Sequence, residues 1–90
     1  MHRDDRHHVP AAALRGLERG DVAGASAFLA QGGEVDARGP EEYFRRSTLL
    51  MVAADCGAEP TVAALLRLGA DADMCDSAGA TALMLSLIHI

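Results

Sequence analysis

The stretches Phe28–Gly32 (FLAQG) and Leu65–Gly69 (LLRLG) lie 37 residues apart, and each is followed, four residues after its glycine, by an aspartate, Asp36 or Asp73. Both stretches place apolar residues at helical spacing and end in a glycine, which can adopt the left-handed conformation that ends a helix. Repetition of a whole unit at a period of about 20–50 residues is typical of solenoid proteins. We therefore expect a stack of similar units that presents a binding surface.

Each unit is predicted to contain two short antiparallel helices, because the same shift of 37 residues also aligns a second pair of glycines, Gly20 with Gly57. Pro10 and Pro60 suit helix starts, and Asp21 and Thr48 suit N-caps. The apolar residues expected on the four helix faces are Ala13, Leu14 and Leu17; Val22, Ala25, Phe28 and Leu29; Leu50, Val52, Ala53 and Ala54; and Val62, Leu65 and Leu66.

A third unit begins after Asp73 and is incomplete. Thr81, Leu83 and Met84 repeat Thr48, Leu50 and Met51 at a shift of 33, but the correspondence fails from Ser86 onward. We predict a flexible tail over residues 1–9 and one repeat domain over residues 10–90. Its units span residues 10–37 (a capping repeat), 38–75 (a full repeat) and 76–90 (a truncated repeat).

Composition limits the classes of function. Ninety residues form at most one small domain, and a net charge of −5 argues against nucleic acid or anionic membranes as partners. The two cysteines cannot form a disulfide framework or a two-by-two zinc site, which favours a reduced, intracellular setting. With neither a signal peptide nor a membrane span in the sequence, we expect a cytoplasmic protein.

The segment Thr48–Gly57 (TLLMVAADCG), followed by Val62, Leu65, Leu66 and Gly69–Asp73 (GADAD), resembles an ankyrin repeat. The resemblance covers about residues 10–90 and is strongest over residues 44–75. It implies an all-α solenoid of stacked antiparallel helix pairs, about two repeats plus the start of a third, in which alanines permit close approach and leucines fill the seam between repeats. It also implies a non-enzymatic module that binds a protein partner through finger loops and a concave face.

The sequence departs from the family pattern at three places. Met51 and Met84 replace a histidine that usually connects the threonine-capped turns, and Tyr43 and Arg46 replace the aspartate and glycine of the turn. Ala11 replaces the first threonine, as expected of a terminal repeat.

The first connection between units is four residues longer than the second, and it carries two of the three aromatic residues. Loops on a rigid scaffold often bind partners, and aromatic and arginine side chains dominate binding energies. Alternatively, Tyr43 or Phe44 folds back onto the core. The predicted partner-binding residues are Glu41, Glu42, Tyr43, Phe44, Arg45 and Arg46 in this extended loop, and Met74, Ser77 and Ala78 in the next one.

No catalytic residue, metal site or cofactor is predicted, and no small-molecule substrate is expected. The acidic run Asp71–Asp76 lacks the glycine and the bidentate acid of a calcium loop, and the histidines of the N-terminal tail lack fixed geometry. Cys56 precedes a helix stop, where the helix dipole should raise the pKa of its thiol.

The final hexapeptide, Leu85–Ile90 (LSLIHI), resembles the translation of a transposon end sequence used in preparing sequencing libraries. Because the repeat register fails at Ser86, we expect that this hexapeptide is not native and that the chain is an N-terminal fragment. A natural apolar terminus is the alternative. A second functional interpretation is therefore an N-terminal regulatory segment of a larger enzyme or channel subunit.

Overall fold

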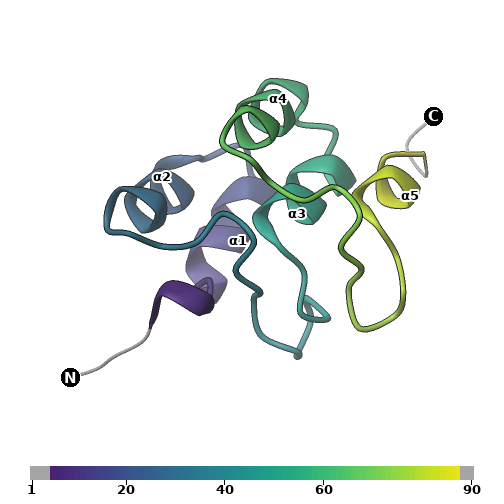
Figure 1. Cartoon of the computed structure of the whole chain (residues 1–90), viewed down its shortest axis with the longest axis horizontal. Coiled ribbons are helices and arrows are strands. Elements are labelled where there is room, and N and C mark those ends of the chain that lie inside the picture. The colour runs from purple at the N-terminus through teal and green to yellow at the C-terminus, as the bar shows by residue number, and fades with distance from the viewer. Residues whose placement is uncertain (1–4, 88–90) are drawn as a thin grey trace.

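The computed structural model describes residues 5–87, and within them the chain forms helices and no strand (Figure 1). The elements are a short 3-10 helix η1 (Asp5–His7) and the α-helices α1 (Ala11–Glu18), α2 (Ala23–Ala30), α3 (Leu49–Asp55), α4 (Glu59–Arg67) and α5 (Ala82–Leu87). The all-α fold class is confirmed for this part of the chain.

The helices form two packed pairs and a continuous row. Helix α1 packs against α2 and α3 packs against α4, while α1, α3 and α5 pack side by side in that order. In Figure 1, α2 and α4 lie on one side of this row, and the long loops before α3 and α5 extend on the other side. The arrangement therefore repeats from one pair to the next.

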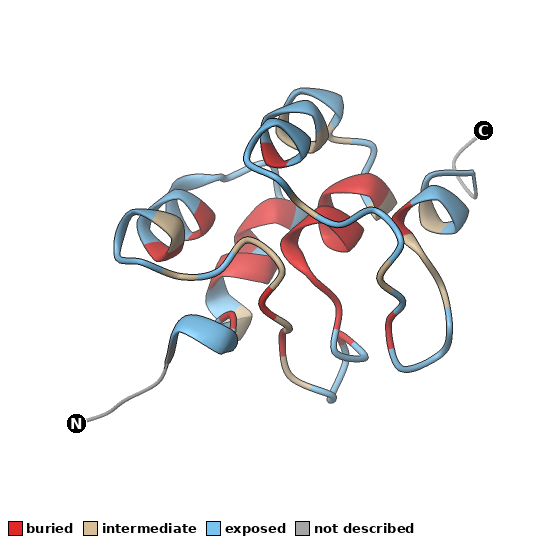
Figure 2. Cartoon of the chain, in the orientation of Figure 1, coloured by how far each residue is buried: buried red, intermediate tan, exposed pale blue. Residues whose placement is uncertain are grey.

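Helix α3 is the centre of the hydrophobic core. Six of its seven residues are buried, and Leu49 and Ala53 have no exposed surface. Figure 2 shows the buried ribbon concentrated in α1 and α3. A helix that is apolar on all sides needs neighbours on all sides, and α1, α4 and α5 supply them.

The start of α3 confirms the predicted cap at Thr48, whereas the N-cap of α2 is Val22 and not the predicted Asp21. The Thr48 hydroxyl accepts a hydrogen bond from the Met51 amide at 3.3 Å, and the Thr81 hydroxyl accepts one from the Met84 amide at the same distance. The Asp21 carboxylate accepts from the Ala23 amide at 3.0 Å. Two helices separated by 33 residues thus begin with the same capping interaction, which satisfies an otherwise unpaired backbone donor.

The repeated glycines reverse the chain as expected. Gly32 has a φ of 96° and Gly69 a φ of 93°, in the left-handed region that residues with a side chain rarely adopt. No atom would contact a Cβ within 4 Å at Gly69, so conformation and not crowding requires the glycine there.

The predicted flexible tail over residues 1–9 is wrong for its second half. Val9 is 2 % exposed, and its amide donates to the Arg38 carbonyl at 3.0 Å. The Glu34 amide donates to the Arg6 carbonyl at 2.9 Å, which fixes η1 against the turn after α2. A thin core uses the apolar Val9 side chain, and residues 1–4 lie outside the described part of the chain.

Two apolar residues expected on buried helix faces are exposed instead. Val22 is 45 % exposed, since it precedes α2 and is not part of its inner face. Leu66 is 46 % exposed, because α4 buries Leu65 and leaves the next position toward solvent.

Substitution of Ala53 tests the close approach of the helices around α3. Because interiors are tightly packed, Ala53→Leu should lower the free energy of unfolding by about 1–3 kcal/mol. Ala64→Leu, on an exposed position of α4, should change it by less than about 0.5 kcal/mol. Urea unfolding followed by circular dichroism measures both, and equal effects would contradict the packing described for α3.

Candidate functional site

The loop that follows α2 and the loop that follows α4 lie side by side and form one surface. We call residues 39–47 the first loop and residues 75–81 the second loop. The Ser77 amide donates to the Arg45 carbonyl at 2.8 Å, and the Ser77 hydroxyl donates to a Glu41 carboxylate oxygen at 3.0 Å. Figure 1 shows both loops projecting to the same side of the helix row.

Arg38 connects the two loops at their base. Its guanidinium donates to the Arg46 carbonyl at 3.0 Å and to the Cys75 carbonyl at 2.6 Å. A similar connection joins the turn after α2 to the turn after α4, where the Asp36 carboxylate accepts a hydrogen bond from the Asp71 amide at 2.8 Å. Residues separated by 35 or 37 positions therefore contact each other, close to the period of the sequence repeat.

The second loop is shaped by a buried carboxylate. Asp76 is 7 % exposed, and one of its oxygens accepts from the Ala78 and Ala80 amides, each at 2.9 Å. Its own amide donates to the Ala80 carbonyl at 2.9 Å. A carboxylate that accepts backbone hydrogen bonds fixes the turn, so Asp76 is a structural residue of the loop tip.

The first loop turns without such a carboxylate. Tyr43, Arg45 and Arg46 have φ values of 68°, 52° and 57°, so three residues with side chains occupy the left-handed region. The Arg46 amide donates to the Pro40 carbonyl at 3.1 Å, and the Ser47 hydroxyl donates to the Phe44 carbonyl at 2.5 Å. The expected extended loop is thus a compact series of turns. Such backbone costs about 1–3 kcal/mol per residue and persists only when its surroundings hold it.

The side chain of Phe44 holds this loop in place. Phe44 is 5 % exposed and belongs to the hydrophobic core, whereas Tyr43 is 75 % exposed. Their rings meet edge to face with centroids 4.8 Å apart and planes at 89°. The alternative that one of these aromatics folds back onto the core is confirmed for Phe44, whose ring anchors the loop and is not available at the surface, while the neighbouring ring of Tyr43 faces solvent.

The remaining predicted residues mostly lie on the accessible surface of the two loops. Met74 is the exception, since it is half-buried and packs against the hydrophobic core. The exposed ones are Glu41, Glu42, Tyr43, Arg45 and Arg46 in the first loop and Ser77 and Ala78 in the second.

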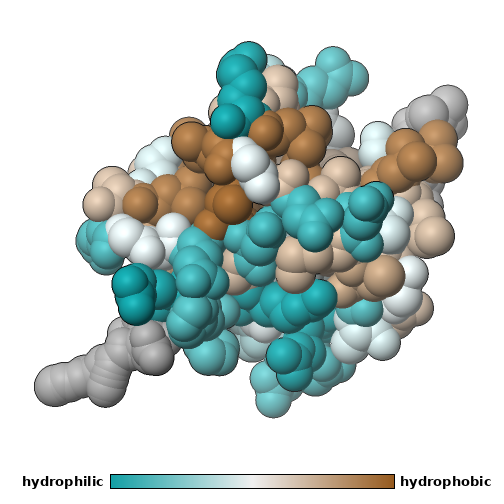
Figure 3. Space-filling view, viewed as in Figure 1, coloured by the Kyte–Doolittle hydropathy of each residue, from teal (hydrophilic) through white to brown (hydrophobic). Residues whose placement is uncertain are grey.

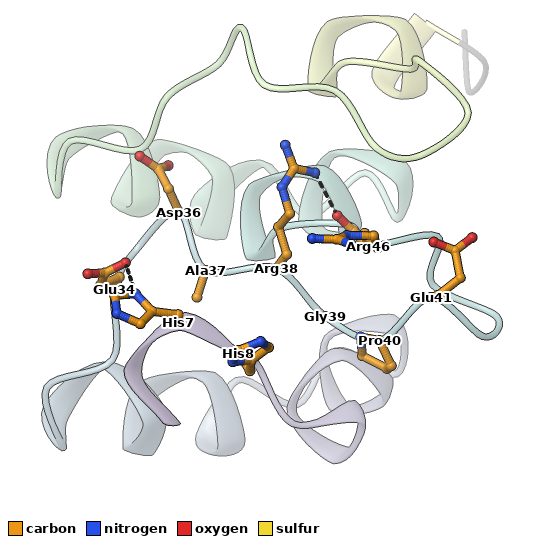
Figure 4. Close-up of a pocket in the computed structure, with 10 residues that line it drawn as sticks. All are labelled: His7, His8, Glu34, Asp36, Ala37, Arg38, Gly39, Pro40, Glu41 and Arg46. Atoms are coloured by element: carbon orange, nitrogen blue, oxygen red, sulfur yellow. Dashed lines mark hydrogen bonds and ion pairs between the residues drawn. The ribbon is translucent and has the colours of Figure 1, made fainter. Parts of the chain in front are cut away.

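A polar cavity of about 470 Å³ lies beside the first loop (Figure 4). Acidic and basic side chains both line it, and His7 Nδ1 lies 2.7 Å from a Glu34 carboxylate oxygen. Figure 4 shows Arg38 and Arg46 on one side of the cavity and Glu41 at its end. The full lining is His7, His8, Glu34, Asp36, Ala37, Arg38, Gly39, Pro40, Glu41 and Arg46.

Sequence reasoning missed His7, His8, Glu34 and Arg38 as residues near the loop surface. The two histidines were assigned to a flexible tail, and the connecting role of Arg38 depends on a contact 37 residues away. The repeat period offered one signal, because Arg38 and Cys75 occupy equivalent positions at that shift.

Cys56 is exposed and follows the last residue of α3. Partial burial raises the pKa of the Cys56 thiol, and the nearby carboxylates of Asp55 and Glu18 raise it further. The direction agrees with the prediction, although burial and carboxylates cause it. A thiol with a raised pKa forms less of the nucleophilic thiolate.

Among residues 5–87, no group of three or more histidine, cysteine, aspartate or glutamate side chains is placed to hold a metal ion. None of the helices described is both long enough and apolar enough to cross a membrane. No protein-family model matches the chain, and a search of curated proteins returned no match.

Substitutions of the adjacent residues Phe44 and Tyr43 test their different roles in the first loop. Phe44→Ala should lower the free energy of unfolding by about 3–5 kcal/mol, because it empties a core position. Tyr43→Ala should lower it by no more than about 1.5 kcal/mol, since that ring is largely exposed and loses only its edge-to-face contact with Phe44. Thermal and urea unfolding measure the difference, and comparable losses for the two variants would contradict the assigned burial.

Proposed function

We propose that this chain is a non-catalytic binding module of the ankyrin-repeat type. The fold proposal is supported by paired helices, by the row α1, α3 and α5, and by the threonine caps of α3 and α5. The resemblance of Thr48–Gly57 to an ankyrin repeat agrees with this arrangement. Both point to a scaffold that displays loops.

The observation that carries the functional proposal is the coupled pair of loops. The first loop is anchored by Phe44 and by its hydrogen bonds with Arg38 and Ser77, so its exposed residues are held before any partner arrives. A pre-organised surface loses little conformational entropy on binding. A protein partner is thus bound at the tips of both loops.

The exposed chemistry of the loops suits a protein surface. Tyr43 offers a large, rigid ring, and rings of this kind often contribute most of the binding energy of an interface. Glu41 and Glu42 precede it, and Arg45 and Arg46 follow it. The polar cavity beside the loop adds further charged groups of both signs. We propose Tyr43 as the anchor, with the surrounding charges selecting orientation.

Capture from a cell lysate tests this proposal. The immobilised chain should enrich a partner protein, identified by quantitative mass spectrometry, and Tyr43→Ala should reduce that protein's recovery at least about tenfold. Tyr43→Phe should retain most of it, because the ring remains. Leu68→Ala provides the matched control, since Leu68 is a 61 % exposed apolar residue that directly follows α4, outside both loops.

The comparison requires that all variants remain folded, which circular dichroism checks. If recovery of every enriched protein were the same for Tyr43→Ala and the wild type, the assignment of Tyr43 would be refuted.

A further inference from the structure

A small pocket lies beside the Tyr43 ring and is lined by residues of α1, α3 and both loops. Its volume is about 240 Å³, which is below the range of about 300–1,000 Å³ that is usual for pockets that enclose a small molecule. A pocket of this size suits a single side chain of a partner protein. Of the described residues that line it, only Leu85 belongs to the final hexapeptide, so the pocket is built almost entirely from the repeats.

Two helices place an acid at this pocket from equivalent positions of the repeat. Glu18 is the last residue of α1, Asp55 is the last residue of α3, 37 positions later, and both line the pocket. A carboxylate is unfavourable at this end of a helix, because the helix dipole already places negative partial charge on the last carbonyls. Sequences break such local rules mainly at functional sites. The two helix ends therefore give the pocket a negative potential.

The Cys56 thiol shows that the two carboxylates act on the same place. Partial burial raises the pKa of this thiol, and the charges of Asp55 and Glu18 raise it further, although Glu18 belongs to the other repeat. Arg45 is the single base among the described lining residues, and it forms no ion pair with either acid. The arginine of the loop therefore does not neutralise the pocket.

Aromatic and apolar side chains form the rest of the pocket. Tyr43 is largely exposed, and its edge-to-face contact with Phe44 orients its ring. Met51 and Val52 also line the pocket and are buried, so they supply an apolar floor. An exposed ring beside carboxylates attracts a cation to its face, and an apolar floor suits the methylene stem of a long basic side chain.

We infer that this pocket receives an arginine side chain of the partner protein, which stacks its guanidinium on the Tyr43 ring and pairs it with the Glu18 carboxylate. Asp55 adds further attraction at the same end of the pocket. Arginine fits this combination better than lysine, because a planar guanidinium both stacks on aromatic rings and binds carboxylates through two donors. The inference rests on the proposed binding function and specifies the chemistry of the partner.

The charge of the whole chain favours the same kind of partner. A net charge of −5 attracts a basic protein and repels an acidic one. Figure 3 shows hydrophilic side chains on the side of the molecule to which the loops project, and hydrophobic ones over α4 and at the α5 end. Polar and charged contacts are therefore expected on the loop side.

Titration of the full chain with the blocked tripeptide acetyl-Gly-Arg-Gly-amide, followed by NMR, tests the inference with a defined probe. The amide signals of Glu18, Tyr43 and Asp55 should shift in a saturable manner. The matching citrulline peptide has nearly the same size and a planar end group but no charge. It should bind at least about threefold more weakly, because it loses the cation–π contact and the ion pair.

Substitutions identify the groups that bind the arginine peptide. Glu18→Gln and Tyr43→Ala should each raise its Kd by about two- to fivefold. Arg45→Gln should lower the Kd by about twofold, because it removes a competing positive charge, and damage to the fold would not produce such a gain. Glu59→Gln makes the same change of charge as Glu18→Gln but lies on α4 outside this pocket, so it should leave the Kd unchanged. Circular dichroism checks that each variant is folded.

Equal affinity for the arginine and citrulline peptides, or a Kd that Glu18→Gln leaves unchanged, would overturn the inference. If either result accompanied capture of a partner that depends on Tyr43, the proposed function would stand and the arginine pocket alone would be rejected. Absence of any partner that depends on Tyr43 would instead reject the proposed function.

Discussion

The structure depends on the burial of α3 among three other helices. Nearly all of this seven-residue helix is apolar, and a helix of that length is not stable alone in water. Its neighbours α1, α4 and α5 remove that surface from water, and Ala53 and Ala54 allow them to approach closely. Each helix pair has too little apolar surface to be stable in isolation, so the pairs stabilise one another.

The packing of the helices determines where the two loops lie. Thr48 and Thr81 begin α3 and α5 with the same cap, which places the ends of the two loops in equivalent settings. Phe44 enters the core next to these helices, and Arg38 ties the base of the first loop to the second. The exposed ring of Tyr43 is held in place by groups that are themselves buried or bonded to backbone.

The sequence predicted those features that depend on local chemistry or on the repeat. Helical spacing located the helices, glycines located their ends, and Thr48 was recognised as a cap because its side chain contacts an amide only three residues away. These features depend on neighbours in the chain or on the period, and both are visible in a single sequence.

Features that depend on distant contacts were not predicted. The core position of Val9 requires knowledge of Arg38, 29 residues later, whose carbonyl binds its amide. Sequence alone could not decide which of Tyr43 and Phe44 faces solvent, because adjacent aromatics in a turn are equivalent until the backbone conformation is known. That conformation includes left-handed residues that are not glycine, and no local sequence pattern predicts such residues.

The central claim is that the helix stack holds the two loops together as one surface, and native-state hydrogen exchange followed by NMR tests it most directly. The Ser77 amide, which donates to the Arg45 carbonyl of the neighbouring loop, should exchange far more slowly than an amide in an unfolded chain, alongside the amides of α3. Exchange of the Ser77 amide at the unfolded rate while the α3 amides remain protected would contradict the claim, because the loops would then move independently.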